Sequence, residues 1–399
     1  MKKTFLFVIL AVFAGNFLIA QPGCVKDVIY ALVSQNEVVR ARKIMEEQCF
    51  PGNQSSADVW LVRANVFIRL HQYELDRKQK DAKYQIRWPD AIVTANESFY
   101  KALELRSDVR TPQGLLSPQD GQVLSAFPIS ELAGKAMDKK NYAEAIRLLN
   151  LVIRSYRVDP KAYAQYLGYA YLDLANSYRA MGDEENYKKF LLDAAKLNVP
   201  ERNIYLQLYN LYEREHDTVK CGEVLAQARK ILPNDLEIRG YELNYFAMLG
   251  DTAHLRMAAM AIFEQTKTNP VGIAFVVEYM IDNKEYLLAE EMIETGIAIA
   301  PDNFDLNLQM TYRYFYEAED YERIRADRMN ERPRNIEGAK LAEARRDELW
   351  GQGIIWAEKA YNINPNDMKL NKMYNYMLLR LNKEVPEDLK ERIDSYNKQ

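Results

Sequence analysis

Apolar residues recur at helical spacing along much of the chain, most clearly between residues 270 and 301. Four of them stand at i, i+3, i+4 and i+7, the spacing of one helix face: Ile273, Val276, Val277 and Met280. A polar break at residues 282–284 separates this stripe from a second one that starts at Tyr286. Proline commonly stops a helix, so Pro301 marks the end of the second stripe. The pattern predicts a helix, a tight turn, a second antiparallel helix and a stop.

The same arrangement recurs at a nearly fixed interval. Prolines that follow successive stripes lie 31 to 37 residues apart: Pro200, Pro233, Pro270 and Pro301. Weaker copies of the pattern occupy residues 128–160, 168–200 and 201–233. Internal repeats of this length are typical of solenoids, in which each unit buries its apolar face by stacking on its neighbours. Glycine and proline are scarce, 16 and 14 of 399 residues, which favours helices joined by short loops.

The residues at the repeating positions resemble those of tetratricopeptide repeats. In residues 168–200 the first helix would carry Tyr171, Leu174, Ala175 and Tyr178, and the second Tyr187, Leu191, Ala194 and Pro200. The resemblance covers most of residues 24–380. It implies an all-α fold, a right-handed α-α superhelix of about seven to eight helix pairs, in a protein that binds other proteins.

We expect four segments along the chain. Residues 1–20 form a signal peptide, and residues 21–110 form an N-terminal helical hairpin and a repeat with an insertion. Residues 111–302 form the regular solenoid, and residues 303–399 form a repeat with elongated helices followed by capping helices.

The start of this last segment allows two interpretations. One divides residues 303–365 into two degenerate repeats; it would bury Arg325 and Arg328, at a cost of several kcal/mol each if they are unpaired. The other is a single repeat whose long helices project from the solenoid and turn near residues 331–335. We favour the second, because it leaves both guanidinium groups near solvent.

The N-terminus indicates export. Lys2 and Lys3 precede an apolar run, and Ala20 ends the segment with a small residue, so we expect cleavage after Ala20 and a periplasmic or otherwise exported protein. No later segment approaches the roughly 20 apolar residues of a membrane span. A lipoprotein attached at Cys24 is the alternative, although the residues before this cysteine make a poor lipid-attachment signal.

The chain has three cysteines, Cys24, Cys49 and Cys221. Residues 24–49 read as a helical hairpin, which would place Cys24 at the start of one helix beside Cys49 at the end of the next. In an exported protein such a pair is expected to form a disulfide. Cys221 occupies a helix-crossing position and is expected to be a small buried residue.

The sequence offers little for catalysis or for cofactors. Its three histidines, His71, His216 and His254, lie in different repeats and beside no cysteine, so a metal site or an activated nucleophile is poorly supplied. Basic and acidic residues number 53 and 57, which does not suggest a nucleic-acid partner. We therefore expect a non-enzymatic protein without a cofactor or metal.

Side chains on one side of the first helices would line the concave groove that the resemblance implies. They are Leu172, Asn176, Arg179, Arg202, Tyr205, Tyr209 and Tyr212. An amide can bond an extended backbone and an arginine can bond a carboxylate, so this mixture suits peptide recognition. The other interpretation is that the tyrosines pack between helices.

These observations predict an interaction scaffold or adaptor in the bacterial cell envelope. Its partner would be another envelope protein or a peptide. The alternative is a glycan-binding component of outer-membrane carbohydrate uptake, since such proteins also carry helix pairs. The sequence does not identify the partner.

Overall fold

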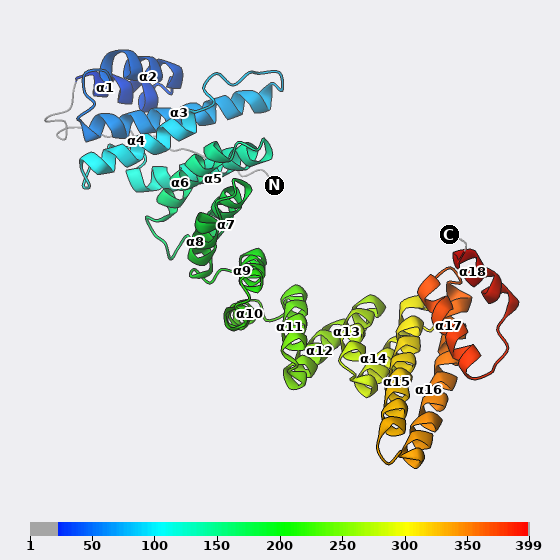
Figure 1. The fold of residues 1–399 in the computed structure, drawn as a ribbon. Helices are drawn as coiled ribbons and strands as arrows, with labels where there is room; N and C mark the ends of the chain where they lie inside the picture. Colours follow the sequence, from blue (N-terminus) through cyan, green and yellow to red (C-terminus); the bar gives the residue numbers. More distant parts are fainter. Residues whose placement is uncertain (1–22, 398–399) are drawn as a thin grey trace. The chain divides into compact units, whose positions relative to one another are not determined.

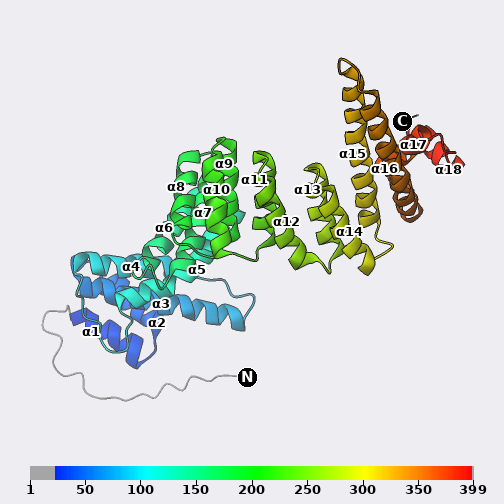
Figure 2. The ribbon, with the colours of Figure 1, turned by 90° about the horizontal axis from the view of Figure 1, so that it is seen from below.

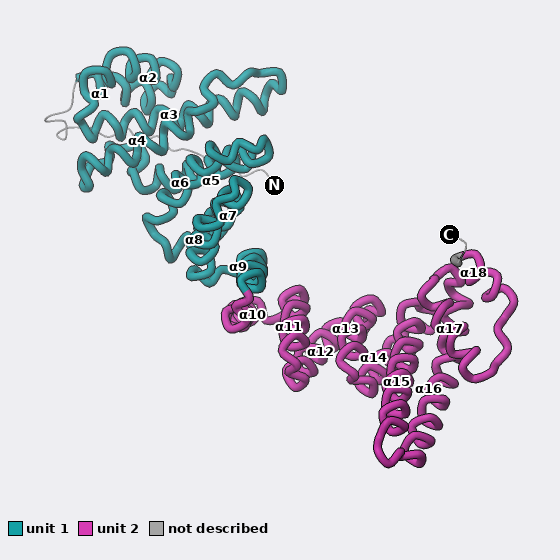
Figure 3. Tube along the Cα trace, viewed as in Figure 1, with its two compact units in different colours: residues 1–215 teal, residues 216–399 magenta. Residues whose placement is uncertain are grey.

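The computed structural model describes residues 23–397, and this range contains eighteen α-helices and no β-strand. The chain divides between residues 215 and 216 into two compact units, here called unit 1 and unit 2 (Figure 3). The division falls inside the repeat expected over residues 201–233. The sequence also placed boundaries between groups of repeats at residues 110 and 302. Both boundaries stay predictions.

Unit 1 contains nine α-helices within its described residues (Figure 1). They are α1 Gly23–Ile29, α2 Val38–Ile44, α3 Ala57–Lys80, α4 Ala91–Leu105, α5 Pro118–Asp138, α6 Tyr142–Tyr156, α7 Ala164–Ala180, α8 Glu184–Ala195 and α9 Arg202–Arg214. Short π-helical turns, Tyr30–Ser34 and Met45–Cys49, extend α1 and α2. Helices pack as consecutive pairs, α3 on α4, α5 on α6 and α7 on α8, and each pair also contacts the next.

Unit 2 continues the same architecture (Figure 2). Its helices are α10 Thr218–Ile231, α11 Leu236–Leu249, α12 Thr252–Thr266, α13 Pro270–Asp282, α14 Tyr286–Ile299, α15 Phe304–Asn330, α16 Ile336–Ile363, α17 Met368–Arg380 and α18 Glu387–Asn397. The pairs are α11 with α12, α13 with α14, α15 with α16 and α17 with α18. With the three pairs named in unit 1 and the N-terminal pair of α1 with α2, the described residues form eight helix pairs within the units. The predicted all-α fold of stacked helix pairs is confirmed.

Most of the turns inside the pairs share one backbone geometry. In five of them a residue adopts the left-handed conformation, with φ between 52° and 79°: Lys140, Gly182, Gly250, Lys284 and Asn382. The next residue donates its backbone N–H to the carbonyl five positions earlier, at 2.8 to 3.0 Å: Asn141 to Ala136, Asp183 to Tyr178, Asp251 to Phe246, Glu285 to Met280 and Lys383 to Leu378. This bond satisfies a carbonyl that the helix end would otherwise leave free. The repeat is therefore visible in the main chain as well as in the side-chain pattern.

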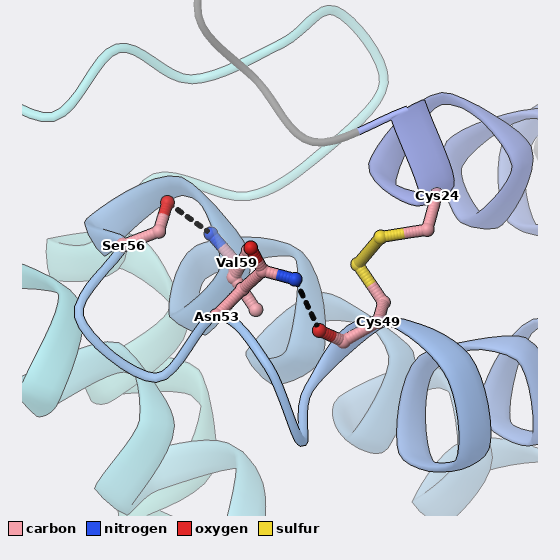
Figure 4. The surroundings of a disulfide bond; sticks show 5 residues. All are labelled: Cys24, Cys49, Asn53, Ser56 and Val59. Carbon is pink, nitrogen blue, oxygen red and sulfur yellow. Dashed lines mark hydrogen bonds between the residues drawn. A yellow bond between two sulfur atoms is a disulfide. The ribbon is translucent and has the colours of Figure 1, made fainter.

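A disulfide closes the N-terminal hairpin, as the sequence predicted. Cys24 at the start of α1 is bonded to Cys49 at the end of the second helix, with 5.4 Å between their Cα atoms (Figure 4). The Asn53 side chain donates to the Cys49 carbonyl at 2.8 Å, and the Ser56 hydroxyl accepts from the Val59 N–H as the N-cap of α3. The hairpin is thereby fixed to the start of α3.

The repeat over residues 304–363 has elongated helices of 27 and 28 residues, joined over residues 331–335. This is the single long repeat that the sequence favoured. Its outer half is packed by small residues and ion pairs: Ala339 and Ala342 are buried, and Arg346 is buried beside Glu322. Hydrogen bonds from Arg325 and Arg346 lower the pKa of Glu322 to about 2.

The predicted signal peptide, residues 1–20, lies outside the described residues. From residue 23 to residue 397, no helix is long and apolar enough to cross a membrane.

We predict that replacing both Cys24 and Cys49 by serine destabilises unit 1. The bond spans 25 residues, and closing a loop of that size restricts the unfolded chain by about 3 kcal/mol. Hydrogen exchange should therefore accelerate in α1 to α3 while exchange in α13 to α16 is unchanged. Equal exchange of α1 in both proteins would contradict a stabilising role.

Candidate functional site

The residues predicted to line a groove lie on two helices of unit 1. Leu172, Asn176 and Arg179 belong to α7, and Arg202 begins α9. Three tyrosines, Tyr205, Tyr209 and Tyr212, lie further along α9. The two helices are linked through α8, which packs against both.

The premise that the three tyrosines form an exposed face is corrected by the structure. Tyr205, Tyr209 and Tyr212 are only 0%, 2% and 5% exposed. The Tyr205 hydroxyl donates to the Val199 carbonyl at 3.0 Å, and burial raises its pKa to about 12. The opposite face of α9, which carries Ile204 and other aliphatic residues, is buried as well. Both the tyrosine side and the aliphatic side of α9 are therefore packed, and only a polar strip that includes Glu213 is exposed, so the tyrosines belong to the core rather than to a groove wall.

The polar members of the predicted set lie closer to solvent. Arg179 is exposed, with its guanidinium 5.4 Å from the centre of the Tyr187 ring, and Arg202 is also exposed. Asn176 is half-buried, and its side-chain oxygen has no hydrogen-bond partner. Leu172, in contrast, is buried. Binding by Asn176, Arg179 and Arg202 stays a prediction.

Sequence reasoning missed a titratable residue on this part of α7. Asp173 is half-buried, and burial raises the pKa of its carboxyl to about 6, with a further contribution from the nearby carboxylate of Glu201. It is therefore partly protonated near neutral pH, which an exposed aspartate would not be.

A second candidate site lies in unit 2, where α13 and α15 pack side by side. Between them is a hollow of about 270 Å³, lined by Val271, Ala274, Phe275, Glu278, Asp305, Leu308 and Gln309. Val271 and Phe275 are 66% and 44% exposed, and the buried side-chain oxygen of Gln309 has no hydrogen-bond partner. We call this feature the α13–α15 hollow. It combines apolar surface with an unsatisfied acceptor, which suits a guest that brings an apolar group and an N–H donor.

A fixed positive charge lies beyond the hollow along α15. Tyr312 and Tyr316 lie one and two turns beyond Gln309, and the Lys369 ammonium of α17 is 4.2 Å from the centre of the Tyr312 ring. Burial disfavours the charged form of Lys369, but the two tyrosines outweigh burial and raise its pKa. Lys372, one turn further along α17, is exposed. The surface beyond the α13–α15 hollow therefore presents ammonium groups suited to an acidic group.

Beyond the tyrosines the same surface reaches a mixed polar cluster. Arg380 donates to the Tyr376 hydroxyl at 2.9 Å, and the Tyr376 ring meets the buried Trp350 edge-on at 5.7 Å. Burial raises the pKa of Glu319, whose Oε1 atom is buried without a hydrogen-bond partner. We call the whole strip, from the α13–α15 hollow to this cluster, the inner face of unit 2.

The histidines remain isolated from one another. His254 lies on the surface with Nδ1 2.7 Å from an Asp251 oxygen, and burial lowers the pKa of His71. Among the residues described, no three His, Cys, Asp or Glu side chains gather in a way that would hold a metal ion. The expectation of a non-enzymatic protein stays a prediction.

Known proteins offer limited guidance. No protein-family model matches the sequence, and no curated protein does. Among solved structures, Pseudomonas aeruginosa pilF is 15% identical and matches 61% of this chain and 90% of its own, with a TM-score of 0.28. A TPR repeats protein from Bacteroides fragilis is 13% identical over 79% and 98% of the two chains, with a TM-score of 0.22. Yeast Tom70 is 12% identical over 94% and 83%, with a TM-score of 0.34.

At these TM-scores the similarity carries no argument about function. The chain's own helix pairs and their shared turns form the all-α arrangement of stacked pairs that the resemblance to tetratricopeptide repeats implied.

We predict that Tyr209→Ala unfolds or severely destabilises unit 1. Removing a buried aromatic side chain typically costs about 3 to 5 kcal/mol, and Tyr209 is 2% exposed. Chemical denaturation measures the loss, with Glu213→Ala on the exposed side of α9 as the control. Unchanged stability in Tyr209→Ala would restore the tyrosines as an exposed binding face.

The raised pKa of Asp173 predicts that the stability of the fold falls as pH rises. Its pKa is about 6 when folded and 3.8 when unfolded, so ionisation opposes folding as pH rises through this window. Asp173→Asn should therefore match the parent protein near pH 4 and exceed its stability at pH 8, by at most about 3 kcal/mol. Thermal unfolding of both proteins at several pH values tests this. A pH-independent difference would show that the carboxyl is not perturbed.

Proposed function

We propose that the protein is a non-enzymatic interaction scaffold that holds an extended peptide segment of another protein on the inner face of unit 2. The observation that carries the proposal is the α13–α15 hollow, whose lining includes the exposed Val271 and Phe275 and also Gln309, the side-chain oxygen of which is unpaired. An extended segment would place an apolar side chain in the hollow and donate a backbone N–H to Gln309.

The charges along α15 and α17 suggest an acidic residue further along the bound segment. From Gln309 to Tyr312 and Tyr316 the helix rises about 5 to 10 Å, at about 1.5 Å per residue. An extended chain covers that distance in about two to three residues. A carboxylate at that spacing would reach Lys369 and Lys372, and a charge-assisted hydrogen bond is stronger than a neutral one. The proposed ligand is a segment with an apolar residue and, two or three residues later, an acidic one.

We also propose that the protein works in a bacterial envelope compartment. The apolar N-terminal segment has the features of a secretory signal. The disulfide between Cys24 and Cys49 fits an oxidising compartment, where such bonds persist. Its partner would be another exported protein.

The experiment is selection of a displayed random-peptide library on the chain from Gln21. We expect enrichment of an apolar residue with an acidic residue two or three positions away. In a titration of a selected peptide, Phe275→Ala and Lys369→Ala should each raise the Kd at least tenfold, about 1.4 kcal/mol. Both side chains are exposed, so the fold should be unaffected.

Leu341→Ala serves as the matched control, since this leucine of α16 is 68% exposed and lies outside the inner face. Peptides that bind Phe275→Ala and Lys369→Ala as tightly as the parent protein would place the binding surface elsewhere.

A further inference from the structure

Unit 2 contains a second, larger hollow. It measures about 610 Å³ and is lined by Arg256 and Met260 of α12, by residues 284–288 and Glu291 at the start of α14, and by Glu317 of α15. We call it the α12–α14 hollow. It shares no lining residue with the α13–α15 hollow. A ligand of one is therefore held by different side chains from a ligand of the other.

Exposed apolar side chains surround this hollow. Leu287 is 74% exposed, more than any other large apolar residue described between residues 23 and 397, and Met260 is 38% exposed. Met257, three residues before Met260 on α12, is 64% exposed. A monomeric soluble protein seldom gathers exposed apolar groups around a concave surface without a partner. Methionine adapts its shape to a guest, and is common at helix-binding surfaces.

The uncompensated charge around the hollow is negative. Arg256 is bonded to Glu285 at 2.6 Å, and Lys284 is bonded to Asp320 at 3.0 Å, so both cations are already neutralised. Glu317 forms an ion pair with the buried Arg313 at 2.9 Å.

Two carboxylates remain on α14. Glu291 and, one turn later, Glu294 are exposed, and neither has an ion pair in the described part of the chain. A ligand in this hollow would therefore gain affinity from a positive charge placed near Glu291 and Glu294.

Backbone chemistry decides the form of the guest. The hollow is walled by helices, and the described chain has no strand edge that a bound strand could extend. Only Tyr286, Leu287 and Leu288, in the uncapped first turn of α14, have backbone N–H groups outside the bonding of their helix. An extended guest that crosses from α14 to α12 would therefore leave most of its own N–H and C=O groups without partners, and no side-chain acceptor comparable to Gln309 lines this hollow without an ion pair except Glu291. A helical guest satisfies its backbone internally and can present an apolar stripe.

We propose that the α12–α14 hollow binds a short amphipathic helix of a partner protein. The apolar stripe of that helix packs on Met257, Met260 and Leu287, and a flanking lysine or arginine meets Glu291. The chain would then join two partners, an extended acidic segment at the inner face and a basic amphipathic helix here. This second site does not depend on the first.

The test uses three synthetic 16-residue helical peptides. One has a leucine stripe at i, i+4, i+7 and i+11 flanked by lysines, the second has glutamates in place of the lysines, and the third is a scramble of the first that destroys the stripe. Fluorescence anisotropy with the full chain should give the lysine peptide a Kd at least tenfold below those of the other two. Equal affinity for the lysine peptide and its scramble would mean attraction by charge alone and would overturn the proposal, as would no binding.

Two exposed positions offer matched variants. Leu287 and Val271 each occupy the second residue of a helix, α14 and α13, and line different hollows. Leu287→Gln should weaken the lysine peptide at least tenfold while Val271→Gln leaves it unchanged, and the ranking should reverse for a peptide selected on the inner face.

Charge reversal provides the second criterion. Glu291→Lys should lower affinity for the lysine peptide and raise it for the glutamate peptide. If the preference between the two peptides does not change, or if Leu287→Gln and Val271→Gln behave alike, the hollow is not the binding site. If peptide binding fails at the inner face but the lysine peptide still binds as described, only the first proposal is overturned. The two proposals can therefore be refuted independently.

Discussion

Close helix crossings at small residues are the constraint on which the repeats depend. Gly296 of α14 shows it best, because a Cβ atom there would lie 2.7 Å from Leu306 of α15 and 3.1 Å from Ile273 of α13. The glycine lets one helix contact both its own partner and the next repeat. Ala289, earlier on α14, is fully buried at the crossing with α13. Larger side chains at these points would separate the layers and expose the apolar stripes that hold them.

This stacking determines which surfaces are left for partners. Core positions of α13, such as Val276 and Met280, are used completely, with no exposed area. The rest of the helix surface is a narrow strip that packs against neither neighbouring helix. Where the strips of successive helices adjoin they form hollows, one beside α13 and α15 and one beside α12 and α14. The two proposed binding surfaces of unit 2 thus arise between repeats.

That origin explains why the sequence could predict some features and not others. The periodicity of a single repeat identified Ile273 and its core companions, and hairpin geometry identified the Cys24–Cys49 pair. The same periodicity misassigned Tyr209. Within one repeat it identifies one buried face of a helix, but α9 is buried on more than one side. Gln309 was missed for a related reason: its unpaired oxygen matters only because Phe275, 34 residues earlier, lines the same hollow.

Arg313 lies on α15 between the residues that line the two hollows. It is 2% exposed and forms ion pairs with Glu290 and Glu317, both at 2.9 Å. A buried ion pair adds little net stability but is strongly unfavourable to break, since the remaining charges lose their partners. It therefore fixes the position of α15 against α14 more than it strengthens the fold. Gln309 and Glu317, which line the two hollows, lie one turn before and one turn after Arg313 on the same helix. The ion pairs that position α15 against α14 therefore act on the helix that contributes to both hollows.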